Sequence, residues 1–125
     1  MAVISTPQWS NTSTPQIRLT VNESGSTGNI AKLAWKLEYV AHGYAASTGT
    51  VKKSYSAVIN GGIVASGTYD INGKTGTYTI ASGTKEVAKA TSAKSIPISC
   101  SMAFNLTWSG VYGGTKSASG SMSIP

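Results

Sequence analysis

The sequence has 125 residues, of which only 11% are charged, well below the roughly 25% that is typical of globular domains. Serine, threonine and glycine together supply 48 residues, and the net charge is +6. A chain of this length is expected to form one domain with one core. Apart from Lys52-Lys53 the basic residues stand singly, without the clustering or motif of a nucleic-acid surface, so we expect no nucleic-acid partner.

The first fifteen residues are polar and contain Pro7 and Pro15. This composition predicts a flexible arm or an edge strand over residues 1–15, followed by the folded domain over residues 16–125. No apolar run approaches the ~18 residues that a membrane span needs, and no basic region precedes an apolar stretch as in a signal peptide. We therefore expect neither a membrane partner nor a signal peptide.

Apolar and polar residues alternate along most of the chain, which is the pattern of half-buried β-strands. The expected strands, in chain order, are residues 17–21, 31–39, 55–59, 63–71, 77–80, 96–106 and 118–124. The second strand places Trp35 at the centre of the core, and the fourth is expected to bend or bulge near Gly67. Residues 84–94 contain helix formers without a stable helical stripe, so a helical turn is an alternative there.

Turn residues separate these runs. Asn60-Gly61, Asn72-Gly73, Ser82-Gly83 and Gly113-Gly114 all favour positive φ and predict turns. Short alternating strands at roughly even spacing indicate an antiparallel arrangement. The sequence therefore predicts an all-β, antiparallel two-sheet β-sandwich of the immunoglobulin or fibronectin-III type, with about seven strands.

The inventory of reactive side chains argues against catalysis. His42 is the single histidine and there are four acids, and no nucleophile-elbow pattern occurs. The segment Asp70-Ile71-Asn72-Gly73 lacks the later acidic ligands of a calcium loop, and one Cys with one His cannot supply a zinc site. We therefore expect no enzyme activity, no catalytic residue, no cofactor and no metal.

Cys100 is the only cysteine, so no intrachain disulfide can form. It shares its alternation with Ile98 and Met102, which predicts a thiol on the apolar face of a strand. In such a place a thiol acts as a small hydrophobe.

Four aromatic residues lie outside the strict alternation: Trp9, Tyr44, Trp108 and Tyr112. Sugar sites usually present a tryptophan or tyrosine face beside polar donors, and serine and glycine surround these residues. They are the candidate ligand contacts. The alternative is that Trp9 and Trp108 only cover the ends of the core.

A strand centred on Trp35 is followed by YSAVINGG at 55–62, by a late strand entry TSAKSIPIS at 91–99, and by WSG at 108–110 and SASGSMSIP at 117–125. In this order the features resemble the immunoglobulin-like or fibronectin-like domain of tail-tip and baseplate proteins of long-tailed phages of Gram-positive bacteria. The resemblance covers most of the chain after Gln16, and its motifs are strand and turn patterns.

This resemblance implies a non-catalytic structural or adhesion domain of a virion tail, the N-terminal domain of a longer chain. Its expected partners are other tail or baseplate subunits, with which it assembles, and host cell-wall carbohydrate. The competing hypothesis is a stand-alone carbohydrate-binding module that uses Trp108, Tyr112 and Trp9.

Overall fold

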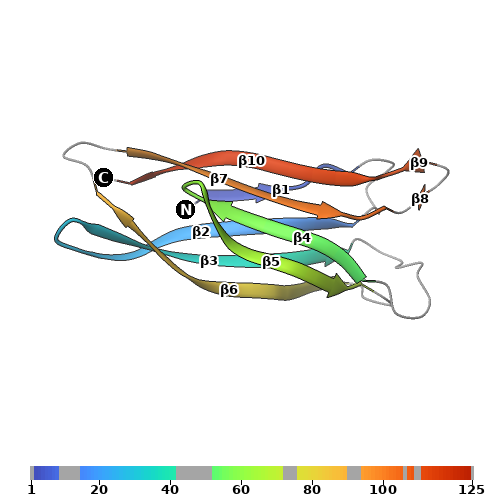
Figure 1. Ribbon diagram of the computed structural model, residues 1–125, viewed down its shortest axis with the longest axis horizontal. Coiled ribbons are helices and arrows are strands. Elements are labelled where there is room, and N and C mark those ends of the chain that lie inside the picture. The colour runs from blue at the N-terminus through green and yellow to red at the C-terminus, as the bar shows by residue number, and fades with distance from the viewer. Residues whose placement is uncertain are drawn as a thin grey trace.

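The computed structural model describes residues 2–8, 15–41, 52–71, 76–89, 94–105, 107–108 and 111–124, and these form two packed antiparallel sheets (Figure 1). The first sheet has the order β1-β2-β3-β6, with bounds β1 Ala2–Ser5, β2 Gln16–Thr27, β3 Ile30–Ala41 and β6 Gly76–Ala88. The second has the order β10-β7-β4-β5, with bounds β4 Lys52–Ile59, β5 Gly62–Asp70, β7 Lys94–Ala103 and β10 Thr115–Ile124. A short ribbon pairs β8 Thr107–Trp108 with β9 Val111–Tyr112.

The predicted all-β, antiparallel sandwich is therefore confirmed, with eight strands in the two sheets where about seven were expected. In immunoglobulin-like sandwiches strands A, B and E share one sheet and C, F and G the other. Here β2, β3 and β6 take the positions of A, B and E, and β4, β7 and β10 those of C, F and G. β5 takes the place of C′, and β1 is an additional strand at the edge beside β2.

Alternating side chains of both sheets fill the space between them. Trp35 lies in this core with 8% of its surface exposed, as predicted, and Cys100 is buried on the inner face of β7. The larger inward side chains of the first sheet are Ile17, Leu19, Val21, Leu33, Leu37 and Tyr39. Those of the second sheet are Ile59, Ile96, Ile98, Met102, Met122 and Ile124.

The predicted turn at Ser82-Gly83 is wrong, because both residues lie within β6. Gly83 is the register partner of Trp35, and a Cβ on Gly83 would lie 3.0 Å from Cζ2 of the indole. The glycine therefore makes room for a large ring across the ladder. The helical turn considered for residues 84–94 is also absent over the part that the structure describes, since β6 continues to Ala88.

The irregularity of β5 falls three residues before the expected position. Ala57 pairs with Ala65 and Val58 with Ile63, so Val64 is the extra residue of the bulge. Gly67 stays in register with Tyr55 and has a φ of 149°.

The two lateral edges of the sandwich close in different ways. β1 lies against β10, and a Cβ on Gly120 would be 2.9 Å from Cγ2 of Ile4. On the other side Lys85 of β6 reaches β5. Its Nζ lies so close to Gly62 that a Cβ added to this glycine would be 3.1 Å away from it. An inward lysine is one way to keep an edge strand from pairing with another chain. Among the described residues no helix is long and apolar enough to cross a membrane.

Candidate functional site

At one end of the sandwich four strands finish and four begin, and we call it the loop end (Figure 1). β1, β3, β5 and β7 finish there, and β2, β4, β6 and β10 begin there, as their registers require. The strand ends that flank residues 6–15, 42–51, 71–75 and 104–114 therefore lie at the same place. All four candidate ligand contacts belong to these four segments.

The opposite end, which we call the turn end, is made of tighter connections. Asn60 and Gly61 have φ of 54° and 79°, as a type I′ hairpin turn requires, so this predicted turn is confirmed. The backbone N–H of Asn60 donates to the carbonyl of Pro97 at 2.8 Å, which fixes the hairpin against β7. β10 ends here, at Ile124.

In immunoglobulin variable domains the ligand loops, including the B–C and F–G connections, lie at one end of the sandwich. In this chain the equivalent connections, from β3 to β4 and from β7 to β10, join strand ends at the loop end.

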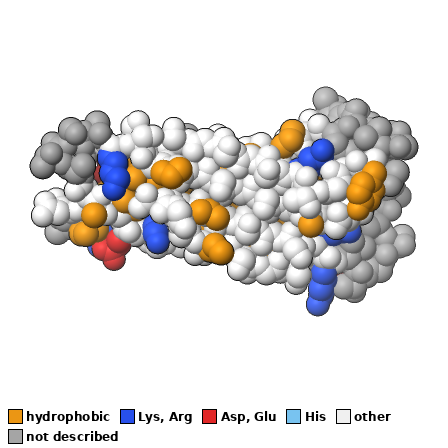
Figure 2. All heavy atoms as spheres, turned by 45° about the horizontal axis from the view of Figure 1, so that its top comes forward, with side chains coloured by type: hydrophobic (Ala, Val, Ile, Leu, Met, Phe, Trp, Pro, Cys, Tyr) orange, Lys and Arg blue, Asp and Glu red, His pale blue; other side chains and the backbone are white. Residues whose placement is uncertain are grey.

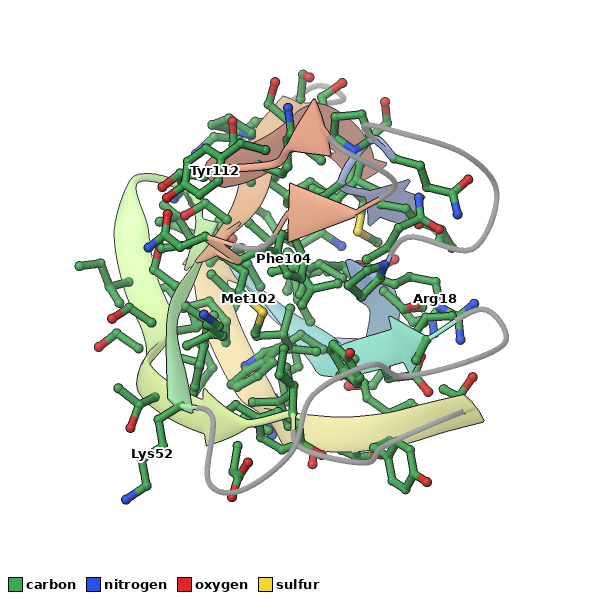
Figure 3. All side chains as sticks on the ribbon, turned by 90° about the vertical axis from the view of Figure 1, so that its right-hand side faces the viewer. Arg18, Lys52, Met102, Phe104 and Tyr112 are labelled. Carbon is green, nitrogen blue, oxygen red and sulfur yellow. The ribbon has the colours of Figure 1, made fainter. Side chains whose placement is uncertain are left out.

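Tyr112 is the candidate contact that the structure describes in full. Its side chain is 63% exposed, and its hydroxyl donates to Oδ1 of Asn105 at 3.0 Å. The backbone N–H of Asn105 donates to the carbonyl of Gly114 at 3.0 Å, and a Cβ on Gly114 would lie 3.6 Å from Cε2 of the tyrosine ring. The hydrogen bond to Asn105 thus orients an exposed ring that lies beside the backbone of Gly114 (Figure 3).

The local sequence explains this arrangement. Phe104 is fully buried and fixes the end of β7, and Asn105 then turns the chain with a φ of 48°. Asparagine tolerates this left-handed conformation better than most residues. Because the Asn105 amide oxygen accepts the phenol proton, the amide nitrogen remains a hydrogen-bond donor beside an exposed aromatic face.

Of the other three candidates, the structure describes only the backbone of Trp108. Trp108 contributes its backbone to β8, where it is the register partner of Val111, and its side chain lies outside the described residues. Trp9 and Tyr44 lie outside the described residues, as does His42. The strand ends that flank all four candidates therefore lie at the loop end, and of the four side chains the structure describes only that of Tyr112.

A tyrosine cluster, defined as Tyr39, Tyr69 and Tyr78, was not singled out from the sequence. The rings of Tyr39 and Tyr69 lie 5.9 Å apart between centroids with an interplanar angle of 41°, so they connect the two sheets. Tyr78 of β6 is the register partner of Tyr39. Exposure rises from 2% at Tyr39, through the half-buried Tyr69, to 37% at Tyr78.

The cluster changes the acidity of its members. Burial raises the pKa of Tyr39 to about 12, with further contributions from Tyr69 and Tyr78. Burial also raises the pKa of Tyr69, helped by Tyr78 and Asp70. Both phenols therefore hold their protons more tightly than an exposed tyrosine does.

Charged residues near the loop end include the outward pair of register partners Lys52 and Asp70. On the first sheet Arg18 forms an ion pair with Glu38 at 3.0 Å, and Lys36 approaches the same carboxylate at 3.8 Å. In the part of the chain that the structure describes, no three His, Cys, Asp or Glu side chains form a group that could hold a metal ion.

Cys100 does not offer a nucleophile. Burial raises the pKa of its thiol to about 12, against a smaller opposing effect of a hydrogen bond with the backbone of Leu19. The predicted placement on the apolar face is confirmed. A thiol that stays protonated in the core is chemically inert.

Comparison with models of protein families, with curated proteins and with solved structures finds no match to this chain. A functional proposal therefore has to be built from the geometry of the loop end and from the resemblance noted in the sequence.

Proposed function

We propose that this chain is a non-catalytic adhesion domain that holds host-surface carbohydrate at its loop end, as part of a phage tail or baseplate. The observation that carries the proposal is the exposed Tyr112 ring, fixed by its hydrogen bond to Asn105. An aromatic face beside an amide donor is the combination that sugar rings need, since they present C–H groups on one face and hydroxyls around the rim. Preorganisation lowers the entropic cost of binding.

The charge distribution supports a neutral ligand. Arg18 and Lys36 form ion pairs with Glu38 on the outer face of the first sheet, away from Tyr112. Tyr112 and Asn105 are both uncharged. The scattered cations of the chain provide weak general attraction to an anionic cell surface.

Binding to purified Gram-positive cell walls, measured by co-sedimentation, tests the adhesion role. We expect Tyr112→Ala to weaken binding about tenfold, because the stacking face is lost. Tyr112→Phe keeps the face and should retain most of the affinity. Asn105→Gly tolerates the positive φ but removes the amide, and it should have an intermediate effect.

Ile63→Ala provides the matched control, since Ile63 is 68% exposed and follows the hairpin of the turn end. The proposal fails if Tyr112→Ala and Ile63→Ala bind cell walls as the unmodified protein does.

The phage-tail setting rests on the sequence resemblance and has its own test. Antibodies raised against the domain should label one end of the tail in electron micrographs of virions of the phage that encodes it. Label on capsids only, or on no virion, would contradict the tail assignment without affecting the carbohydrate test.

A further inference from the structure

Each sheet has two edge strands, and three of the four carry a feature that hinders pairing with a further strand. The edge strands are β1 and β6 in the first sheet and β10 and β5 in the second. β1 has only four residues, β5 contains the bulge at Val64, and β6 contains the bulge at Ile80. Short strands and bulges are two ways in which proteins keep a sheet edge unpaired.

β10 offers a long and regular edge instead. All its residues, from Thr115 to Ile124, pair with β7 without a register shift. The strand contains no proline and no acid, and its one charged residue, Lys116, lies near its beginning at the loop end. The side of the molecule that carries β10 is free of charge across most of its middle (Figure 2). From Ser117 onward the strand therefore lacks the devices that protect the other three edges.

The backbone groups that face this edge follow from the position of Pro97. Its carbonyl accepts a hydrogen bond from the N–H of Asn60, so the backbone of Pro97 points to the β4 side of β7. Pro97 is the register partner of Ser121, and a residue in an antiparallel sheet directs its N–H and its C=O to the same side. Ser121 therefore turns both groups away from β7, toward the open edge. The same holds for every second residue of the strand: Ser117, Ser119 and Ser123.

The sequence of β10 matches itself in the antiparallel orientation. When a second copy is placed with its β10 reversed about Ser119, this serine lies opposite its own counterpart, and Ser117 lies opposite Ser121 of the second copy. The backbone groups of these residues face one another and complete a ladder of hydrogen bonds. Their hydroxyls lie on the same outer face, where such cross-strand pairs are favourable. On the inner side Ala118 meets Gly120 of the second copy, and both residues are small.

The charge of the chain permits this pairing and keeps it weak. Lys116 would face Met122 of the second copy and lie roughly 20 Å along the strands from the other Lys116. That distance exceeds the screening length of about 8 Å at physiological salt. The net charge of +6 on each copy adds a diffuse repulsion. One strand against one strand also covers less than the roughly 1,000 Å² of a stable interface, so we expect a weak pair that strengthens with salt.

We propose that β10 is an interface strand, at which two copies of this chain pair edge to edge and join their second sheets into one antiparallel sheet. The match of the strand to its own reverse selects a second copy over a foreign strand. Because the paired strands run in opposite directions, the loop ends of the two copies lie at opposite ends of the pair. This inference does not depend on the carbohydrate site at Tyr112.

Sedimentation equilibrium up to a protein concentration of about 1 mM tests the pairing. We expect a monomer–dimer equilibrium with a Kd of roughly 0.1 mM that becomes tighter as salt is raised. Ser119→Lys places two like charges opposite each other and should weaken dimerisation at least about tenfold. Ser99→Lys is the matched control, since Ser99 is the register partner of Ser119 on β7. It adds the same charge to the same face, one strand further from the contact, and should have a smaller effect.

A disulfide test locates the contact within β10. In Ser119→Cys the two thiols belong to directly opposite residues with Cα atoms about 5.5 Å apart, so mild oxidation should link the copies. In Ser99→Cys the two thiols are three strand spacings apart, roughly 14 Å, which is too far for a disulfide. The native Cys100 is buried in both variants and does not compete.

Three results would overturn the inference. The protein could stay monomeric up to about 1 mM, which would leave the edge to a foreign strand. Ser119→Lys and Ser99→Lys could dimerise equally well, or the two cysteine variants could cross-link at equal rates, and either result would place the contact elsewhere. None of these results changes the outcome expected for cell-wall binding by the Tyr112 variants.

Discussion

The outer faces of the two sheets are built from different side chains on the same strand pattern. The first sheet carries charges on its outer face, where Arg18 and Lys36 surround the largely buried Glu38. The outward positions of the second sheet are mostly hydroxyls, at Ser54, Ser56, Ser66, Thr68, Ser95, Ser99, Ser101, Thr115, Ser117, Ser119, Ser121 and Ser123. The side of the molecule that carries β7 and β10 is accordingly free of charge across most of its middle (Figure 2).

One row shows how regular this hydroxyl face is. Ser117, Ser101, Ser56 and Ser66 follow one another across all four strands of the second sheet. The hydroxyls of Ser56 and Ser101 lie 3.1 Å apart. The two sheets show that the alternation pattern requires only a polar residue at each outward position. Whether that residue is charged or a hydroxyl decides how the stability of the sheet depends on salt and pH.

The largest expected effect concerns the core of the first sheet. Trp35→Ala should lower the free energy of unfolding by about 3–5 kcal/mol, because a large buried ring is replaced by a cavity. Chemical denaturation measures this loss. A loss below about 1 kcal/mol would show that the indole does not occupy the core.

The close approach of Gly83 to Trp35 makes the next prediction. Gly83→Ala should lower the free energy of unfolding by about 1–3 kcal/mol, since the new methyl group meets the indole ring of Trp35, which is buried in the core. Gly120→Ala is the matched control on the second sheet, where the obstacle is the tip of Ile4, which can rotate away, and it should cost less. Equal losses in the two variants would contradict the different rigidity of the two contacts.

Each inner face contains a well-buried group that resists ionisation, Tyr39 on the first sheet and Cys100 on the second. The pKa of Tyr39 rises from 10 to about 12, so the folded state holds this proton more tightly than the unfolded chain does. The corresponding stability is complete below pH 10 and declines as the pH rises to about 12, by roughly 1–2 kcal/mol. The raised pKa of Cys100 gives a decline that starts near pH 9.

Denaturation series between pH 8 and pH 12 check this prediction. Tyr39→Phe should flatten the decline between pH 10 and pH 12, and Cys100→Ala should flatten the part that begins near pH 9. If the Tyr39→Phe variant follows the same pH curve as the unmodified protein, Tyr39 does not contribute to alkaline unfolding.

The smallest effects belong to the outer faces. Glu38→Gln should lower the free energy of unfolding by about 1 kcal/mol, because the carboxylate is partly buried between two cations. The loss should be smaller in 1 M salt, which screens the ion pairs. Ser56→Ala, its counterpart on the hydroxyl face, should change stability by less than about 0.5 kcal/mol and show no dependence on salt. Salt-dependent stability in the serine variant would contradict the contrast between the faces.

Alternation was sufficient to locate β2 to β5, β7, β10 and the start of β6, and to predict the burial of Trp35 and Cys100, because it depends only on neighbours along the chain. It failed at Gly83, where the reason for a glycine lies on the adjacent strand. It also could not reveal the tyrosine cluster. In β6 the bulge at Ile80 reverses the alternation, so Tyr78 faces Tyr39 although Ser82 and Thr84 of the same parity face outward.

The candidate site was predictable in part. Aromatic residues that break the alternation fall in connections, and connections of a sandwich gather at its ends, so Tyr112 could be selected from the sequence. Its bond to Asn105 and the left-handed φ of Asn105 depend on the fold around Gly114 and could not.

The final strand runs from the loop end to the turn end and stops there at Ile124. A sensor surface, a fluorescent protein or a bead joined after this residue would consequently sit about the full length of the sandwich away from Tyr112. Immobilised in that orientation, every molecule would present the loop end to the solution.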